Sequence, residues 1–510
     1  MKKKQVSQKW PIILFTIGVF MAGLDNGIIS SALTTIYNSF GVSPSWGAWT
    51  VTLYTLGVAI SVPIIGKLSD NYGRKRLFII EILLFGIGSL LVAISPNFTM
   101  LLIARFIQAI GGGGIFIIGT SHVLSTMPKN QQGKVLGLLG GMHGLSAVVG
   151  PNVGALILHI TGTWQWMFLI NIPIALFLIV MGFLKIDETK QPTSNALDVT
   201  GTIYLSLGIV AFMFGITNIN SLELLSSITS VTVLPYLIAG ALFIYLFLTH
   251  EKRLEKNGGD PIISASLLRK RSFQLTLLLG FLSGGFLASI IFIPSFVQQA
   301  LQVPAENAGF WLTPLALASG IGAGLGGFLT DRIGATRTII VSGIIGLLGF
   351  LMFFSFVDDL TTFVIASIFA GIGLGFLLGA PLNVLVGESV EKDRYGTSIG
   401  TLSLTRQVGL TLFPTIFASF ITSGVMKIEP TFKAVFGETV VPFHDVSEGE
   451  GYGEIVGEIE KINDPYLQEQ LLSIVSRVMK SGFQDMFFAA VIISAIVIII
   501  SSYLQMAKIK

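Results

Sequence analysis

The sequence contains no cysteine and few charged residues. None of its 510 residues is cysteine, and only 12% are Asp, Glu, Lys or Arg, whereas soluble domains average about 25%. The lack of cysteine excludes disulfides and thiolate-bound metals. The low charge, together with 52% hydrophobic residues and a mean hydropathy of +0.79, excludes a soluble globular protein of this length. We therefore expect a membrane protein with no metal site, no cofactor and no nucleic-acid partner.

Long apolar runs dominate what the sequence does contain. They are about 20 residues long and do not alternate between apolar and polar residues, so they predict membrane-spanning helices rather than the strands of a barrel. The expected fold is an all-α polytopic membrane protein. Its fourteen predicted spans are 12–36, 47–67, 77–95, 100–123, 133–158, 166–185, 198–219, 232–250, 273–299, 307–328, 337–356, 362–386, 395–421 and 482–505.

Positive charge is concentrated on one side of these spans. Of the 31 lysines and arginines, 24 fall on the side of the N-terminus, five fall on the opposite side, and Arg105 and Arg406 lie within spans. Cytoplasmic loops are enriched in Lys and Arg. Both termini are therefore predicted to be cytoplasmic, and the protein is predicted to be a multi-pass component of the cytoplasmic membrane.

The chain carries an internal repeat. Asp70 and Asp331 occupy the same position in two similar loops, GKLSDNYGRKR and GFLTDRIGATR, and are 331 − 70 = 261 residues apart. We predict two six-helix bundles, residues 1–190 and 261–510, with a two-helix insert at residues 191–260. Parallel repeats of this kind form transporters that rock around a central site. Because one chain holds both bundles, we expect a functional monomer.

One long segment, residues 424–481, is predicted to lie on the outer side. It contains ten acidic and five basic residues. We expect its middle to be mobile. Residues 464–478 have the pattern of a short amphipathic helix, which would lie on the outer membrane surface or over the mouth of the transport path. A plain spacer is the alternative.

The fourth span holds a permanently charged side chain. Arg105 cannot lose its proton, and burying a guanidinium group in hydrocarbon costs about 3 kcal/mol or more. Gln108 lies three residues further on, on the same face of the predicted helix. A charged and polar face within a membrane predicts a path for a solute or an ion. A buried structural role for Arg105 is the alternative.

Asp25, near the middle of the first span, is the candidate proton carrier. Burial favours the neutral carboxyl group, whereas a nearby cation favours the charged one. At about 1.5 Å of rise per residue, the depths of Asp25 and Arg105 differ by roughly 9 Å, which an arginine side chain can bridge. We predict that Asp25 takes up a proton outside and releases it inside, while Arg105 controls its protonation. The alternative is a permanent ion pair that plays no part in turnover.

The repeated loop predicts a cytoplasmic latch. Gly66 and Gly73 permit tight turns, and Asp70 can accept hydrogen bonds from a helix N-terminus or pair with Arg74. Such a contact forms in one state of a rocking transporter and breaks in the other. The alternative is that the basic residues only fix the topology. The second copy of the latch would use Asp331 and Arg337.

These motifs resemble the major facilitator superfamily and, within it, the 14-helix drug:proton antiporter branch. GKLSDNYGRKR is similar to the superfamily signature between the second and third spans. Leu24–Asp25 and Arg105–Gln108 resemble branch motifs, although Ala109 stands where glycine is usual. WQWMFLINIP and LDVTG are similar to the branch patterns for the sixth span and the linker. The resemblance implies the major facilitator fold and covers the chain apart from the outer segment.

The fifth span resembles a motif associated with exporters of that superfamily. Gly137, Gly150, Pro151 and Gly154 match the motif, and Ser146 replaces one of its glycines. Proline bends a helix and small residues permit close packing. This span is therefore predicted to form a seam that seals one side and opens as the halves move. A kinked packing helix without that role is the alternative.

The resemblance implies a proton-coupled antiporter that exports amphipathic, often cationic, drugs or dyes and thereby confers antibiotic resistance. One alternative is an exporter or flippase of an endogenous lipid or metabolite. Another is a membrane enzyme or sensor without transport, although we expect no catalytic residues. The side chains predicted to line the substrate cavity are Asn26, Gln108, His143, Asn383, Arg406 and Gln407.

Overall fold

The computed structural model describes residues 9–189, 197–220, 223–436 and 452–509. These residues form helices and no strands, which confirms the predicted all-α fold. Thirteen helices among them are long and apolar enough to cross a membrane, and a further helix, bent by 42°, is the fourteenth if it counts as one span. The predicted domain boundary between residues 190 and 191 lies outside the described residues.

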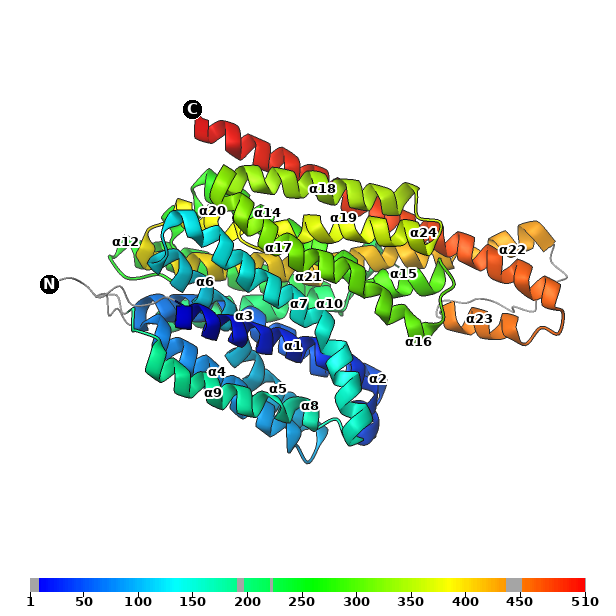
Figure 1. Ribbon diagram of the computed structural model, residues 1–510, viewed down its shortest axis with the longest axis horizontal. Coiled ribbons are helices and arrows are strands. Elements are labelled where there is room, and N and C mark those ends of the chain that lie inside the picture. The colour runs from blue at the N-terminus through cyan, green and yellow to red at the C-terminus, as the bar shows by residue number, and fades with distance from the viewer. Residues whose placement is uncertain (1–8, 190–196, 221–222, 437–451, 510) are drawn as a thin grey trace.

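The first bundle packs its helices side by side along the long axis of the molecule (Figure 1). In it α1 packs on α7, α3 and α4 pack on α5, and α4 also packs on α9. Its helices are α1 (Lys9–Ser39), α2 (Pro44–Gly47), α3 (Trp49–Tyr72), α4 (Arg74–Ala93), α5 (Phe98–Gly113), α6 (Ile115–Thr126), α7 (Lys129–Thr161), α8 (Trp166–Leu169) and α9 (Asn171–Lys185). The fourth predicted span is thus broken at Gly114 into α5 and α6.

The second bundle repeats the packing of the first. Here α14 packs on α21, α17 and α18 pack on α19, and α18 also packs on α24, so the pairs recur in the same order. Its membrane helices and their short extensions are α13 (Ala265–Leu268), α14 (Arg271–Ile291), α15 (Ile293–Gln299), α16 (Ala305–Ala308), η1 (Gly309–Leu312), α17 (Thr313–Ile333), α18 (Ala335–Ser355), α19 (Leu360–Leu378), α20 (Pro381–Ser389), η2 (Lys392–Arg394), α21 (Tyr395–Val425) and α24 (Pro465–Ile509).

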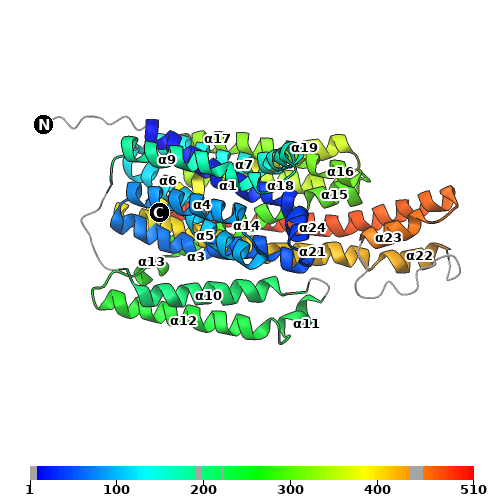
Figure 2. The same ribbon diagram turned by 90° about the horizontal axis from the view of Figure 1, so that it is seen from below.

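The insert lies to one side of both bundles (Figure 2). It consists of α10 (Val199–Thr217), α11 (Leu224–Ile228) and α12 (Leu234–Lys256), and α10 packs on α12, α3 and α21. Asp198 begins α10 by accepting a hydrogen bond from the Gly201 amide at 3.0 Å, and its carboxylate also lies 3.0 Å from the His250 ring of α12. This contact ties the two long helices of the insert together.

The two bundles touch at their cytoplasmic ends and diverge toward the outer face. Four glycines on one face of α7 show how the distance between α7 and α17 increases along the helix. Methyl groups added at Gly133, Gly137, Gly141 and Gly144 would lie 2.4, 2.5, 3.1 and 3.8 Å from the nearest atom of α17. Gly133, where the distance is shortest, lies nearest the cytoplasmic end of α7. The cytoplasmic side of the molecule is therefore the closed one.

The outer segment differs from the expectation. Residues 465–478 are helical, as predicted, but they form the first turns of the long helix α24 rather than a separate short helix, so that part of the prediction is wrong. Asp464 caps the helix by accepting from the Tyr466 amide at 3.0 Å, and no later proline stops it before Ile509. The buried apolar face of these turns packs on α15, α22 (Ile428–Phe436) and α23 (Tyr452–Glu460) rather than on lipid. The rest of the acidic middle, residues 437–451, lies outside the described residues.

We predict that Gly137→Ala weakens the closed cytoplasmic contact. The added methyl group would lie 2.5 Å from the Ala323 carbonyl oxygen, and overpacking of this kind costs about 1–3 kcal/mol. Double electron–electron resonance between spin labels at Gln131 and Arg332 measures the separation, and the cysteine-free sequence leaves no background labelling.

The longer-distance population should grow about five-fold or more in Gly137→Ala. The matched control is Gly324→Ala, because nothing lies within 4 Å of a methyl group at that position of α17. Identical distance distributions in both variants would contradict the proposed close contact.

Candidate functional site

Asp25 of α1 lies at the centre of a buried polar cluster in the first bundle. Its Oδ2 accepts a hydrogen bond from Arg105 Nη1 at 2.7 Å, and its Oδ1 accepts from Gln108 Nε2 at 2.8 Å and from Asn171 Nδ2 at 2.9 Å. Ser89 Oγ accepts from both amides, at 2.8 and 3.3 Å. All five side chains have no exposed surface. One cation and two neutral donors therefore hold the carboxylate.

Four helices assemble this cluster, and their local sequences account for its geometry. Asn97 caps α5 by accepting from the Met100 amide at 2.9 Å. Arg105 and Gln108 then share one face of α5 and bond to each other at 2.6 Å. Asn171 is the first residue of α9, directly after the short helix α8. The predicted contact between Asp25 and Arg105 is thus present, and the amide of Asn171 joins it.

The rest of the Arg105 guanidinium group is also occupied. Its Nε donates to the Thr50 carbonyl oxygen at 3.4 Å, and its Cζ lies 4.2 Å from the centre of the Tyr54 ring and 5.6 Å from that of Phe168. Aromatic faces attract such cations. Removing one partner of a buried ion pair leaves the other charge uncompensated, which costs about 3–5 kcal/mol. The pair therefore fixes α1 and α5 to each other.

A cavity of about 250 Å³ lies between the bundles. Its walls are mainly apolar, and three predicted cavity residues line it: His143 from α7, and Arg406 and Gln407 from α21. His143 and Arg406 are 406 − 143 = 263 residues apart, which is the offset of the internal repeat in these helices. The two side chains are thus equivalent residues of the two bundles.

Three other predicted cavity residues do not line this cavity. Gln108 belongs to the Asp25 cluster. Asn26 follows Asp25 on α1, and it is exposed and is not one of the residues that line the cavity. Asn383 is buried on α20 and donates to the Gly379 carbonyl oxygen of its own chain segment at 3.2 Å.

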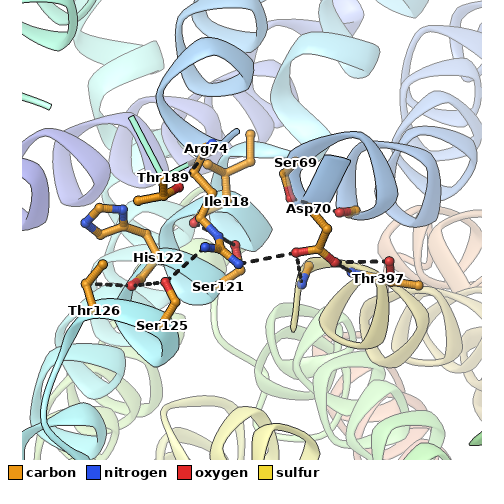
Figure 3. Close-up of polar contacts among 12 residues, drawn as sticks. Ser69, Asp70, Arg74, Ile118, Ser121, His122, Ser125, Thr126, Thr189 and Thr397 are labelled. Carbon is orange, nitrogen blue, oxygen red and sulfur yellow. Dashed lines mark hydrogen bonds and ion pairs between the residues drawn. The ribbon is translucent and has the colours of Figure 1, made fainter. Parts of the chain in front are cut away.

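Asp70, the first of the two predicted latch residues, caps a helix of the opposite bundle (Figure 3). Its carboxylate accepts from the amides of Gly396 and Thr397, at 3.0 and 2.8 Å, and from the Thr397 hydroxyl at 3.1 Å. These residues form the first turn of α21. A methyl group at Gly66 would lie 2.4 Å from the Gly396 carbonyl oxygen, so this glycine permits the close approach.

Arg74 anchors the Asp70 carboxylate within the first bundle. Its Nη2 donates to Asp70 at 3.3 Å, its Nε to Ser121 at 2.9 Å and its Nη1 to Ser125 at 3.0 Å (Figure 3). Both serines lie on α6. The turn between Asp70 and Arg74 requires Gly73, whose φ of +95° favours glycine.

Asp331 forms the second latch in the reverse direction. Its two carboxylate oxygens accept from the amides of Gly133 and Lys134, at 2.7 and 2.8 Å, in the first turns of α7. Arg337, predicted to take part, is exposed on α18, and the described contacts of this latch come from Asp331. At the 261-residue offset Arg337 corresponds to Arg76, whereas the equivalent of the anchoring Arg74 is Ala335.

The glycines predicted to form one seam face two different partners. Gly137 lies against α17 of the opposite bundle. Gly150 and Gly154 face α1 of their own bundle, where added methyl groups would lie 2.5 Å from Gly27 Cα and 2.3 Å from Ser31 Oγ. Pro151 lies just beyond the 42° bend of α7, in the position from which its ring crowds the preceding turn.

Glu81 of α4 is a buried acid with a role that the sequence did not indicate. Its Oε2 accepts from the Gly114 amide at 3.0 Å, at the break between α5 and α6. A run of glycines after a polar helix face is the signal that could have suggested such a break.

Two repeated bundles that enclose a central cavity and close at one end define a membrane transporter of the two-bundle type. The sequence profile of the Major Facilitator Superfamily matches residues 15–414. The chain belongs to that superfamily, and its multi-pass location in the cell membrane follows.

Relatives cover nearly the whole chain. It is 54% identical over 503 residues to the uncharacterized MFS-type transporter YfiU of Bacillus subtilis (strain 168). The aligned region covers 97% of this chain and 96% of that relative. It is 32% identical over 524 residues to Multidrug resistance protein 3 of the same organism. That alignment covers 99% of this chain and 97% of the relative. The structure of the human organic anion transporter MFSD10 (TETRAN) shares the fold, with a TM-score of 0.61 at 14% identity. The superposition covers 96% of this chain and 100% of that chain.

We predict that each latch aspartate protects a helix of the other bundle. Asp70→Asn should increase hydrogen exchange at the first turn of α21, and Asp331→Asn at the first turn of α7, because hydrogen bonds to charged groups contribute about 1.5–3 kcal/mol. Peptide-level exchange measured by mass spectrometry should show about a tenfold rise in each case.

Glu469→Gln provides the control, since it removes an exposed carboxylate on α24, which contributes to neither latch. Exchange that rises only in the mutated bundle, or rises equally everywhere, would contradict the crosswise arrangement.

Proposed function

We propose that the protein is a proton-coupled antiporter of the 14-helix drug:proton branch that exports amphipathic small molecules by alternating access. The observation that carries the proposal is the fully buried Asp25 carboxylate, held by Arg105 within the first bundle. Intramembrane ionisable residues of this kind mark proton relays and substrate paths. The similarity to Multidrug resistance protein 3 and the mainly apolar cavity support drug-like cargo.

Protonation of Asp25 would remove the charge that neutralises Arg105 and so weaken the hold between α1 and α5. Helix α1 packs on α7 through Gly150 and Gly154, and α7 begins at the Asp331 latch. A change at Asp25 can therefore reach the cytoplasmic closure through two packed helices. A proton entering from outside would drive the inward-opening step, and its release inside would restore the ion pair and the closed cytoplasmic end.

Substrate-induced proton release from proteoliposomes tests this proposal. Wild type should move a drug or dye against its gradient when a proton gradient is imposed. The transport rate of Asp25→Asn should be lower by about tenfold or more, because asparagine cannot carry a proton. Glu469→Gln should retain the wild-type rate. The double variant Asp25→Asn/Arg105→Gln removes both charges of the pair and checks that the loss is not a folding defect.

Undiminished proton-coupled transport by Asp25→Asn would show a permanent ion pair and overturn the proposal. If only a lipid or an endogenous metabolite is transported, the alternative cargo replaces drugs and dyes.

A further inference from the structure

The central cavity contains a cation but no acid. Arg406 is the one Lys or Arg among the described lining residues, and none of these residues is Asp or Glu. Asp25, the buried acid of the first bundle, is already paired with Arg105 and does not line the cavity. A molecule entering this cavity therefore meets apolar walls and a single positive group.

The Arg406 guanidinium group is incompletely bonded. Its Nε donates to Ser283 Oγ at 3.1 Å, but its Nη2 is buried and contacts no acceptor among the described residues. Arg105, the other arginine within a predicted span, has a carboxylate at 2.7 Å and two aromatic rings around it. A buried charge without a counter-ion is costly, and Arg406 is one of the residues that line the cavity, so a ligand bound there can supply the missing acceptor.

We infer that the cavity binds an amphipathic organic anion, with one apolar body and a carboxylate, sulfonate or phosphate group held by Arg406. This inference deepens the proposed function by naming its substrate class. Arginine presents a planar pair of donors that matches such oxyanions. The apolar lining, which includes Phe116 and Leu374, would cover the rest of the molecule. The ligand anion would supply the charge that no protein side chain supplies.

The charge of the cavity also argues against the cationic cargo expected from the family resemblance. A cation in this space would lie beside Arg406 and His143 without a carboxylate to compensate it. Like charges brought together in a low-dielectric site repel strongly. A volume of about 250 Å³ suits one compact apolar body rather than a phospholipid with two acyl chains.

Binding of three matched fluorescent probes to the purified full-length protein in detergent tests this inference. The probes share one compact fluorescent body and differ only in the head: 6-(dimethylamino)-2-naphthoic acid, its primary amide, and the corresponding aminomethyl compound. Wild type should bind the acid about tenfold or more tightly than the amide, and the amine more weakly than the amide. Arg406→Gln should reduce the affinity for the acid to that for the amide and leave the amide affinity unchanged.

Two further variants separate the anion contact from general damage. Arg406→Lys keeps the charge but not the paired donors, so its affinity for the acid should be intermediate. Arg271→Gln removes an arginine that stacks on Tyr503 away from the cavity, and it should leave all three affinities unchanged.

Equal or tighter binding of the amine would overturn the inference, as would an equal loss for all three probes in Arg406→Gln. Displacement of the acid by phosphatidylglycerol at equal affinity would overturn the single-body substrate class. If the preference for the acid holds while no probe is transported in exchange for protons, this inference stands and the proposed function fails.

Discussion

A guanidinium group inside a membrane protein must be neutralised where it lies, because it cannot discharge itself by losing a proton. The first bundle meets this constraint within the protein. Asp25 supplies the counter-charge for Arg105, and the amides of Gln108 and Asn171 satisfy the other carboxylate oxygen. The result is a neutral cluster that connects α1, α4, α5 and α9. Arg406 of the second bundle lacks such a counter-charge, since none of the described residues that line the cavity between the bundles is an acid.

The cytoplasmic closure depends on a different electrostatic need. The first turn of a helix carries unpaired amide groups and a partial positive charge, and α7 and α21 both present this turn to the opposite bundle. Asp331 of the second bundle accepts hydrogen bonds from amides of α7, and Asp70 of the first bundle accepts them from amides of α21. On opening, the same amides and carboxylates would bond to water at the membrane surface. The two states can therefore be close in free energy, which a reversible transporter requires.

Much of this arrangement could be predicted from residue types and spacing. Apolar runs gave the helices, and the cost of burying Asp25 and Arg105 gave their pairing. The ability of Asp70 to accept from a helix N-terminus was also predictable, but which helix it would cap was not, since that depends on how the bundles meet. Glu81 could not be assigned because its partner is a backbone amide at a helix break. Arg337 was misjudged because its counterpart in the first loop is Arg76, whereas the counterpart of the anchoring Arg74 is Ala335.

The outer segment shows the same limit. The pattern of residues 464–478 correctly indicated an amphipathic helix, but periodicity does not specify what covers the apolar face. That face packs on α15, α22 and α23, and the helix continues into the last span. A local sequence pattern identifies a surface that must be buried, whereas the partner is set by the tertiary fold.

The most direct test of the account is whether Asp25 itself changes protonation during transport. Infrared difference spectroscopy of the protein in liposomes, recorded as a transported substrate is added, measures the carboxyl stretching bands. The account predicts a protonation-dependent band that changes with substrate in wild type and in Glu469→Gln and is absent in Asp25→Asn. A band that persists in Asp25→Asn, or no change in wild type while protons are exchanged for substrate, would contradict the account.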